Sequence, residues 1–130
     1  MILDTTFLID VMRGDSAAAE KIKYLIEKGV PLAVTTINIF ELFSGVAQCS
    51  KPALERARIS HILNNQTIWP LDKASAERGG RVHGELARQG TEIDPEDAMI
   101  AGIALEHNEA VLTRNVKDFS RISGLHVETY

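Results

Sequence analysis

The chain has 130 residues, of which 45% are hydrophobic and 25% charged, a balance that fits one globular domain over residues 1–130 and argues against disorder. Its net charge of −4 is opposite to that of proteins held on nucleic acid by a basic surface, although acids gathered in one site would also produce it. No apolar run approaches the roughly 20 residues that cross a bilayer, so we expect a cytoplasmic protein without a membrane segment.

Short apolar runs predict the strands, and longer segments with apolar residues at helical spacing predict the helices. The strands are expected at residues 1–4, 31–36, 67–71, 110–113 and 125–129. The helices are expected at residues 16–28, 36–46, 51–65, 73–89 and 95–105, with a short helix or turn at residues 116–122. Ser16 is a suitable N-cap for the first of these helices, and Gly29 is a suitable residue to end it. The alternation of strand and helix predicts an α/β fold with a parallel sheet covered on both faces.

Four carboxylates lie where the chain is expected to pass between strand and helix. They are Asp4, Glu41, Asp97 and Asp118. The carboxyl ends of neighbouring parallel strands open onto one edge of a sheet, which is where ligands bind in such folds. We therefore expect these side chains to gather in one pocket, where carboxylates repel each other unless some are protonated or a cation neutralises them.

The donor atoms of this cluster indicate which cation it takes. Oxygen ligands without histidine or cysteine suit Mg²⁺, with Mn²⁺ as an alternative, and the single Cys49 argues against a structural zinc site. Mg²⁺ commonly joins carboxylates to substrate phosphates and lowers the pKa of a bound water, so the cluster favours hydrolysis of phosphate esters. Whether one ion or two are bound cannot be read from the spacing.

Each acid taken alone fits an ordinary structural role at a strand end or in a helix, and only the four together indicate a site. Other acids nearby are interpreted differently. We expect Asp94 and Glu96 to cap a helix or to be solvated, because neighbours in sequence point in different directions. Asp10 is expected to be structural, with a role in supporting a ligand as the lesser alternative.

The four acids lie in four sequence blocks. These are Met1-Ile-Leu-Asp-Thr-Thr-Phe-Leu-Ile-Asp, Phe40-Glu-Leu-Phe-Ser-Gly, Asp97-Ala-Met-Ile-Ala-Gly-Ile-Ala and Thr113-Arg-Asn-Val-Lys-Asp-Phe-Ser-Arg-Ile-Ser-Gly-Leu. In this order, and from end to end of the chain, they resemble the PIN-domain ribonucleases. The small size without an appended domain looks most like the VapC toxins of VapBC toxin-antitoxin pairs.

The resemblance implies an α/β/α sandwich, a homodimer, and a Mg²⁺-dependent endoribonuclease that hydrolyses RNA phosphodiester bonds with a metal-activated water. It also implies inhibition by a VapB-like antitoxin that lays a C-terminal segment over the active site. The catalytic and metal-binding residues carried over are Asp4, Glu41, Asp97 and Asp118, and the supporting residues are Thr5, Thr113 and Asn115. One departure is Gly102, which stands where alanine is more usual and which we expect to be harmless.

Basic residues near the acids are candidates for contacts with RNA phosphates. Those closest in sequence are Arg13, Arg114 and Lys117. Arg114 is the best placed, although a strand end sends it equally well to solvent or to a carboxylate of the antitoxin. A second set, Arg78, Arg81 and Arg88, recurs at helical spacing, and we interpret it as a solvated helix face rather than an RNA track.

Two other functions remain open at this point. One is a housekeeping PIN nuclease that processes RNA without an antitoxin. The other is a non-catalytic module that binds a metal or accepts a phosphoryl group. The first strand supplies only Asp4 rather than a pair of acids, and no lysine follows a strand as a phosphoacceptor would need, so the second alternative is disfavoured.

Overall fold

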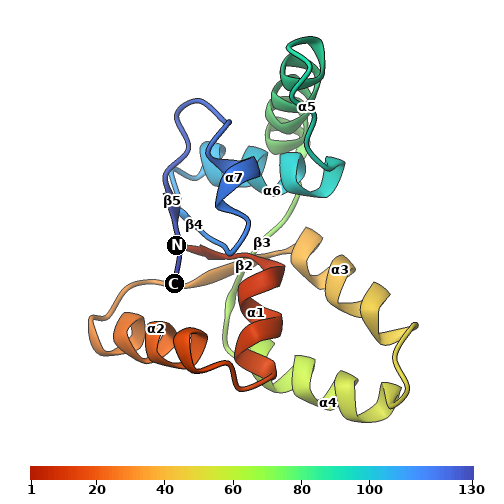
Figure 1. Cartoon of the computed structure of the whole chain (residues 1–130), viewed down its shortest axis with the longest axis vertical. Helices are drawn as coiled ribbons and strands as arrows, with labels where there is room; N and C mark the ends of the chain where they lie inside the picture. The colour runs from red at the N-terminus through yellow and green to blue at the C-terminus, as the bar shows by residue number, and fades with distance from the viewer.

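The computed structural model describes residues 1–130 and contains one five-stranded sheet, in which all strands are parallel (Figure 1). The strands are β1 (Ile2–Leu3), β2 (Ala33–Thr35), β3 (Thr67–Trp69), β4 (Val111–Leu112) and β5 (Val127–Glu128). Their order across the sheet is β3-β2-β1-β4-β5. The first strand is therefore central, with Ile2 in register with Ala33 on one side and Val111 on the other.

Helices cover both faces of this sheet. They are α1 (Thr5–Met12), α2 (Ser16–Glu27), α3 (Thr36–Val46), α4 (Pro52–Leu63), α5 (Lys73–Arg88), α6 (Pro95–Glu106) and α7 (Val116–Phe119). One hydrophobic cluster joins the sheet to α1, α2, α3 and α4, and a second joins it to α5, α6 and α7. The three-layer α/β/α sandwich expected from the sequence is confirmed (Figure 1). None of the helices has the length and apolar composition needed to cross a bilayer.

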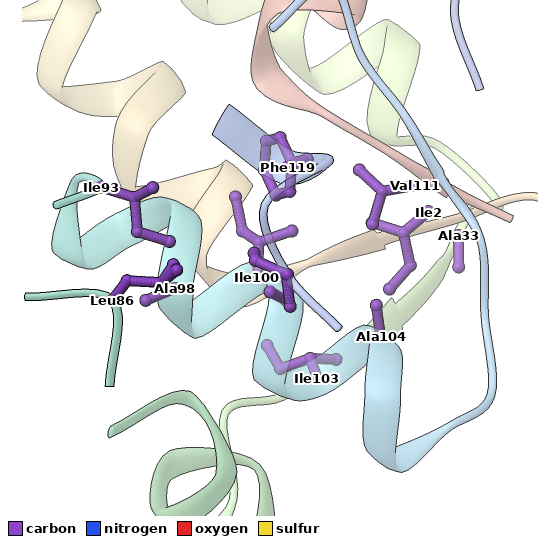
Figure 2. Packing of buried hydrophobic residues seen from close by; sticks show 12 residues of the cluster. Ile2, Ala33, Leu86, Ile93, Ala98, Ile100, Ile103, Ala104, Val111 and Phe119 are labelled. Carbon is purple, nitrogen blue, oxygen red and sulfur yellow. The ribbon is translucent and has the colours of Figure 1, made fainter. Parts of the chain in front are cut away.

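The central strands divide their side chains between the two layers. Ile2 and Val111 belong to the cluster under α6 and α7 (Figure 2). Leu3 and Leu112 belong to the opposite cluster. Successive residues of a strand point to opposite faces, so a strand that is buried on both sides reads as a continuous apolar run. This burial is the reason that such short runs predicted the sheet correctly.

Helices α5 and α6 pack backbone against backbone. A Cβ atom on Gly102 would lie 2.4 Å from the carbonyl oxygen of Ser75 and 2.7 Å from the amide nitrogen of Gly79. A Cβ atom on Gly79 would in turn lie 2.8 Å from the carbonyl oxygen of Ala98. Glycine at position 102 therefore suits this close crossing, and the alanine that is more usual there would require the two helices to shift. The crossing holds α6, which carries Asp97, at its place beside the sheet.

Two details near the first strand differ from the expectation. Helix α1 begins at Thr5, directly after β1, although no full helix was assigned there from the apolar pattern. Helix α2 is capped by Asp15, whose carboxylate accepts a hydrogen bond from the amide of Ala18 at 2.9 Å, and not by Ser16. The sequence contains two suitable caps in succession, and the first of them, which follows Gly14 with its positive φ, is the one used.

Candidate active site

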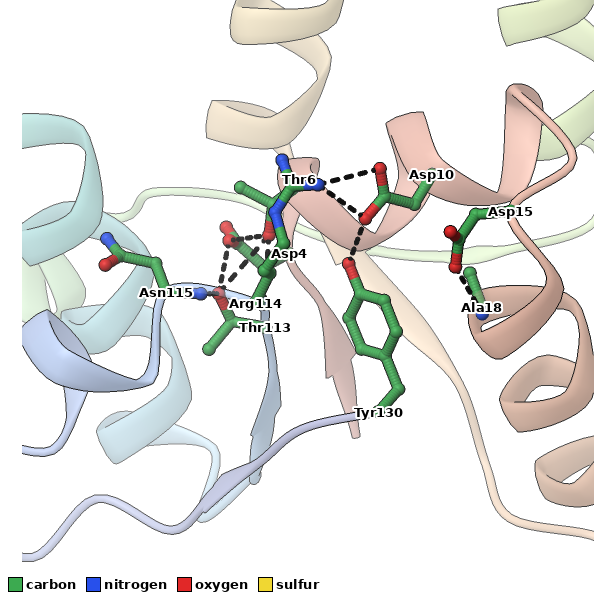
Figure 3. Close-up of polar contacts among 9 residues, drawn as sticks. All are labelled: Asp4, Thr6, Asp10, Asp15, Ala18, Thr113, Arg114, Asn115 and Tyr130. Carbon is green, nitrogen blue, oxygen red and sulfur yellow. Dashed lines mark hydrogen bonds and ion pairs between the residues drawn. The ribbon is translucent and has the colours of Figure 1, made fainter.

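The site lies at the carboxyl edge of the sheet, where β1 ends at Asp4 and the neighbouring strand β4 is followed by Thr113. Asp4 is only 3% exposed, and its Oδ2 accepts hydrogen bonds from the hydroxyls of Thr113 at 2.7 Å and Thr6 at 2.9 Å (Figure 3). The hydroxyl of Thr113 accepts a further bond from the amide of Asn115 at 2.9 Å. Asp4 is thus fixed through one oxygen, and its Oδ1 accepts no hydrogen bond within the chain.

Glu41 enters the site from the second turn of α3 and is held by a chain of buried polar groups. The hydroxyl of Thr5 donates to Oε1 of Glu41 at 2.8 Å, and Nδ2 of Asn38 donates to the same hydroxyl at 3.0 Å. Asn38 is fully buried and forms the capping box of α3 with Thr35. Burial raises the pKa of Glu41 and the Thr5 hydrogen bond lowers it, while the charge of Asp4 raises it further.

Asp97 and Asp118 are joined by the side chain of Asn115. Its Nδ2 donates to Oδ2 of Asp97 at 3.2 Å and to Oδ2 of Asp118 at 3.0 Å. Asp97 lies in the first turn of α6, where the helix dipole favours a negative charge. Burial nevertheless raises the pKa of Asp97 to about 7, and the charges of Asp4, Glu41, Asp94 and Asp118 act in the same direction. Burial and repulsion among the acids therefore outweigh the dipole.

The structure brings the four predicted acids together, three of them from the helical segments in which the sequence placed them. Asp4 follows a strand directly, whereas Glu41 lies within α3 and Asp97 follows the loop between α5 and α6. Asp118 lies in the short helix α7. Convergence at this edge thus depends on helix packing as much as on strand ends.

The three supporting residues all contact the acids, since Thr5, Thr113 and Asn115 each donate a hydrogen bond to one or two of them. Two further residues were missed, namely Thr6 and Asn38. Asn38 was recognisable from the spacing of Thr35 and Asn38, which is that of a capping box. Thr6 had no sequence signal beyond its position two residues after Asp4.

Arg114 is anchored beside the site by a buried acid. Its Nη1 donates to both oxygens of Asp10, at 3.1 and 2.9 Å, and the hydroxyl of Tyr130 donates to Oδ2 of Asp10 at 2.6 Å (Figure 3). Asp10 is 7% exposed, and the amide of Arg114 donates to the hydroxyl of Thr6 at 3.2 Å. Asp10 therefore positions Arg114 and Tyr130 and forms no hydrogen bond with the four acids. Burial and the hydrogen bond to Asp10 raise the pKa of Tyr130, so its hydroxyl remains a donor.

The remaining charged candidates lie at the surface. Arg13 and Lys117 are exposed and form no ion pair. Asp94 is exposed at the N-cap of α6 but makes no capping hydrogen bond with its side chain. Asp94 and Glu96 do add negative charge near the pocket, since both raise the pKa of Glu41.

The acids fit a hard divalent cation by charge and by donor type, but they do not form a finished coordination shell. No group of three or more His, Cys, Asp or Glu side chains converges closely enough to hold a metal ion as the side chains stand. The only basic side chain that contacts any of the four acids is Arg121, with Nη1 at 3.4 Å from Oδ1 of Asp118. The raised pKa of Asp97 records negative charge that a divalent cation would neutralise.

Comparisons with known proteins agree with this geometry. A family model described as PIN domain matches residues 1–125. The chain is 28% identical to the tRNA(fMet)-specific endonuclease VapC of Shigella flexneri over 129 residues, which cover 99% of this chain and 96% of the relative. It is 32% identical to ribonuclease VapC19 of Mycobacterium tuberculosis over 119 residues, which cover 91% of this chain and 90% of the relative.

A solved structure shows the same fold. In DNA-bound VapBC from Salmonella typhimurium, one chain matches this one with a TM-score of 0.87 and 27% sequence identity. The match covers 98% of this chain and 96% of that chain. The agreement thus extends over the whole sheet and all its helices rather than over the acid motifs alone.

Proposed function

The chain belongs to the PIN-domain family and, within it, to the VapC ribonucleases, and from this premise we propose that it is a Mg²⁺-dependent endoribonuclease that acts as the toxin of a toxin-antitoxin pair. We propose Asp4, Glu41, Asp97 and Asp118 as its catalytic and metal-binding residues. Mn²⁺ is an alternative ion, because the ligands are hard oxygens. Action on cellular RNA would take place in the cytoplasm.

One observation carries the catalytic proposal most directly. Asp4 and Asp97 are buried, Glu41 and Asp118 are half-buried, and the pKa of Asp97 is raised to about 7 by burial and by the other three acids together with Asp94. A fold gains no stability from such an arrangement, because each ionised carboxylate raises the free energy of the others. Strongly perturbed acids in a cleft are typical of functional sites, and here they support a site built for a cation.

The protein's own residues prepare the pocket for that cation. Thr113 and Thr6 orient Asp4 through Oδ2, and Asn115 holds Asp97 and Asp118 at a fixed separation. When bound, the cation supplies positive charge for the developing negative charge on the phosphate and lowers the pKa of water. The proposed reaction is in-line attack by water on phosphorus, in which the new P–O bond forms as the bond to one ribose oxygen breaks and that oxygen leaves as a protonated hydroxyl.

Basic residues at the rim are proposed to receive the RNA backbone. The side chain of Arg114 is 61% exposed even while it is paired with Asp10, so part of its guanidinium group faces solvent. Arg13 and Lys117 are exposed and unpaired. We propose these three residues as phosphate contacts.

The partners of the chain are proposed from its family. The Salmonella structure is a VapBC complex, which supports a VapB-like antitoxin as the partner of this chain. We also propose a homodimer, and a single domain over residues 1–130. Light scattering of the purified chain would test the dimer. A small basic reading frame next to the gene would favour the toxin over a housekeeping nuclease.

The catalytic proposal is tested with Asp4→Asn, which removes the charge and keeps the shape of the side chain. We expect the wild type to cleave RNA in the presence of Mg²⁺, and we expect cleavage to stop when a chelator is added. The variant should lose at least about a hundredfold in rate, which corresponds to about 2.7 kcal/mol of transition-state stabilisation. Mapping the RNA ends that appear on brief induction, beside the same variant, would identify the target. Equal cleavage by both proteins would contradict the proposal.

A further inference from the structure

A second concave surface lies on the α5 and α6 side of the sheet. It is a groove of about 730 Å³ between α5, Leu105 of α6 and the segment that follows α7. Its lining is mainly polar, with three arginines, Arg78, Arg81 and Arg121, and the side chains of Gln89 and Ser123. The groove thus presents several side chains that can donate hydrogen bonds.

The charges in this groove are basic on a chain whose net charge is −4. The only acid that lines it is Glu85, which is paired with Arg88 at 3.1 Å. Arg78 is paired with Glu106 at 3.1 Å, whereas Arg81 is exposed and makes no ion pair or side-chain hydrogen bond. Arg81 therefore has all its donors available for a ligand.

Arg121 connects the groove to the acids. It lines the groove, and its Nη1 lies 3.4 Å from Oδ1 of Asp118 and 3.4 Å from the carbonyl oxygen of Glu92. One end of the groove is therefore next to the proposed catalytic pocket. An RNA strand with a phosphate at the acids can therefore reach the groove past Arg121.

We propose that this groove binds the phosphate backbone of single-stranded RNA beside the bond to be cleaved, with Arg81 as the principal contact and Arg78 and Arg121 in support. This inference rests on the proposed ribonuclease function. Arginine suits the role because its planar fork donates two hydrogen bonds to one phosphate. Under this proposal Arg78 and Arg81 differ from the solvated helix face predicted from the sequence, whereas Arg88 does not line the groove and keeps that role.

The experiment compares two arginines on the same helix. Arg81→Gln and Arg88→Gln are each made in the Asp97→Asn chain, so that RNA is bound but not cleaved. The probe is a short fluorescein-labelled single-stranded RNA of mixed sequence, and its Kd is measured by anisotropy at several salt concentrations. Arg81→Gln breaks no ion pair or side-chain hydrogen bond within the chain, so the fold should tolerate it.

We expect Arg81→Gln to weaken binding by about three- to tenfold and to reduce the salt slope by about one, as the loss of one phosphate contact predicts. Arg88→Gln removes a charge outside the groove but leaves Glu85 unpaired inside it, so it should weaken binding by less than Arg81→Gln does. Equal Kd values for Arg81→Gln and its parent would overturn the proposal, and so would equal losses in the two variants. If Arg81→Gln leaves RNA binding unchanged but weakens binding to an acidic antitoxin, the groove is a protein interface and the proposal is wrong.

A cleavage assay separates this inference from the proposed function. In the otherwise wild-type chain, Arg81→Gln should raise KM with little change in kcat, because Arg81 contacts neither the acids nor their hydrogen-bond partners. If the wild type cleaves RNA and Arg81→Gln has the same KM as the wild type, the groove is not an RNA site but the nuclease function stands. If the wild type binds the RNA through Arg81 but does not cleave it in Mg²⁺, the nuclease function is wrong and the groove remains a binding site for RNA.

Discussion

The two halves of the acid pocket are built by different means. Around Asp4, hydroxyls from α1 and from the end of β4 donate to the carboxylate, and Asp10 anchors Arg114 nearby. Around Asp97, the single side-chain hydrogen bond comes from Asn115, and burial with the neighbouring charges raises the pKa to about 7. One half is satisfied by the protein itself, and the other half is left with unbalanced negative charge.

The difference shows what each half contributes. Hydroxyl donors fix the orientation of Asp4 before any ligand arrives, which limits the reorganisation needed during the reaction. The half around Asp97 carries negative charge that attracts a cation, and this charge lowers the stability of the folded state. A stabilising network and a destabilising cluster therefore lie side by side. Substitutions in the two halves should have opposite effects on the stability of the protein.

Asp97→Asn is expected to have the largest effect, with activity and stability changing in opposite directions. Cleavage should fall by at least about a hundredfold, because a proposed ligand of the cation is lost. The metal-free protein should at the same time become more stable at pH 8, by on the order of 2 kcal/mol, since the variant buries no charge at this position and has none for the other acids to repel. Urea unfolding in a chelator measures the stability, and Asp118→Asn is a suitable control because Arg121 already offsets that charge. A variant that is both inactive and less stable would contradict this account.

The pH dependence of stability should show the same asymmetry. Asp97 has its pKa raised from an ordinary value of 3.8 to about 7 in the folded protein, so between these values the folded state holds a proton that the unfolded state has released. Stability therefore falls as the pH rises through this range, and above about 7 the loss is complete. Glu41 acts in the same direction, because burial raises its pKa.

We expect the Tm of the metal-free wild type to fall by about 5 °C or more between pH 5 and pH 8, from a loss on the order of 2 kcal/mol. Asp97→Asn should flatten this part of the curve. Thermal unfolding followed by circular dichroism in a chelator measures both proteins under the same conditions. A wild-type Tm that rises with pH over this range would show that Asp97 is not repelled in the folded state.

Much of the fold was predictable because its physical causes are local. Strands such as β1 and β4 are buried on both faces, so they appear as apolar runs, and α6 is apolar around most of its surface. The α/β/α architecture and all five strands followed from these patterns. The start of α1 was less clear, because its apolar residues continue directly from those of β1.

The candidate site was predictable at the level of its acids and less so for the groups around them. Asp4, Glu41, Asp97 and Asp118 could be found because carboxylates recur at the ends of predicted elements, in four blocks that share one family's order. The contacts of Arg114 and Tyr130 with Asp10 could not be predicted in this way, because each of these residues lies more than a hundred positions from Asp10 in the sequence. The crossing at Gly102 also depends on distances between helices that no sequence spacing expresses.

A smaller effect is expected from Thr113→Val, which tests the satisfied half of the pocket. The substitution removes the hydroxyl that donates to Asp4 at 2.7 Å and accepts from the amide of Asn115, and it keeps the volume of the side chain. We expect about a tenfold loss in kcat, typical of a group that orients a ligand, and a loss of about 1 to 2 kcal/mol in stability because a buried carboxylate loses a donor. Thr113→Ser should restore both, since it returns the hydroxyl. If the valine variant instead matches Asp97→Asn in gaining stability, the two halves of the pocket are not built differently, and the contrast between them fails.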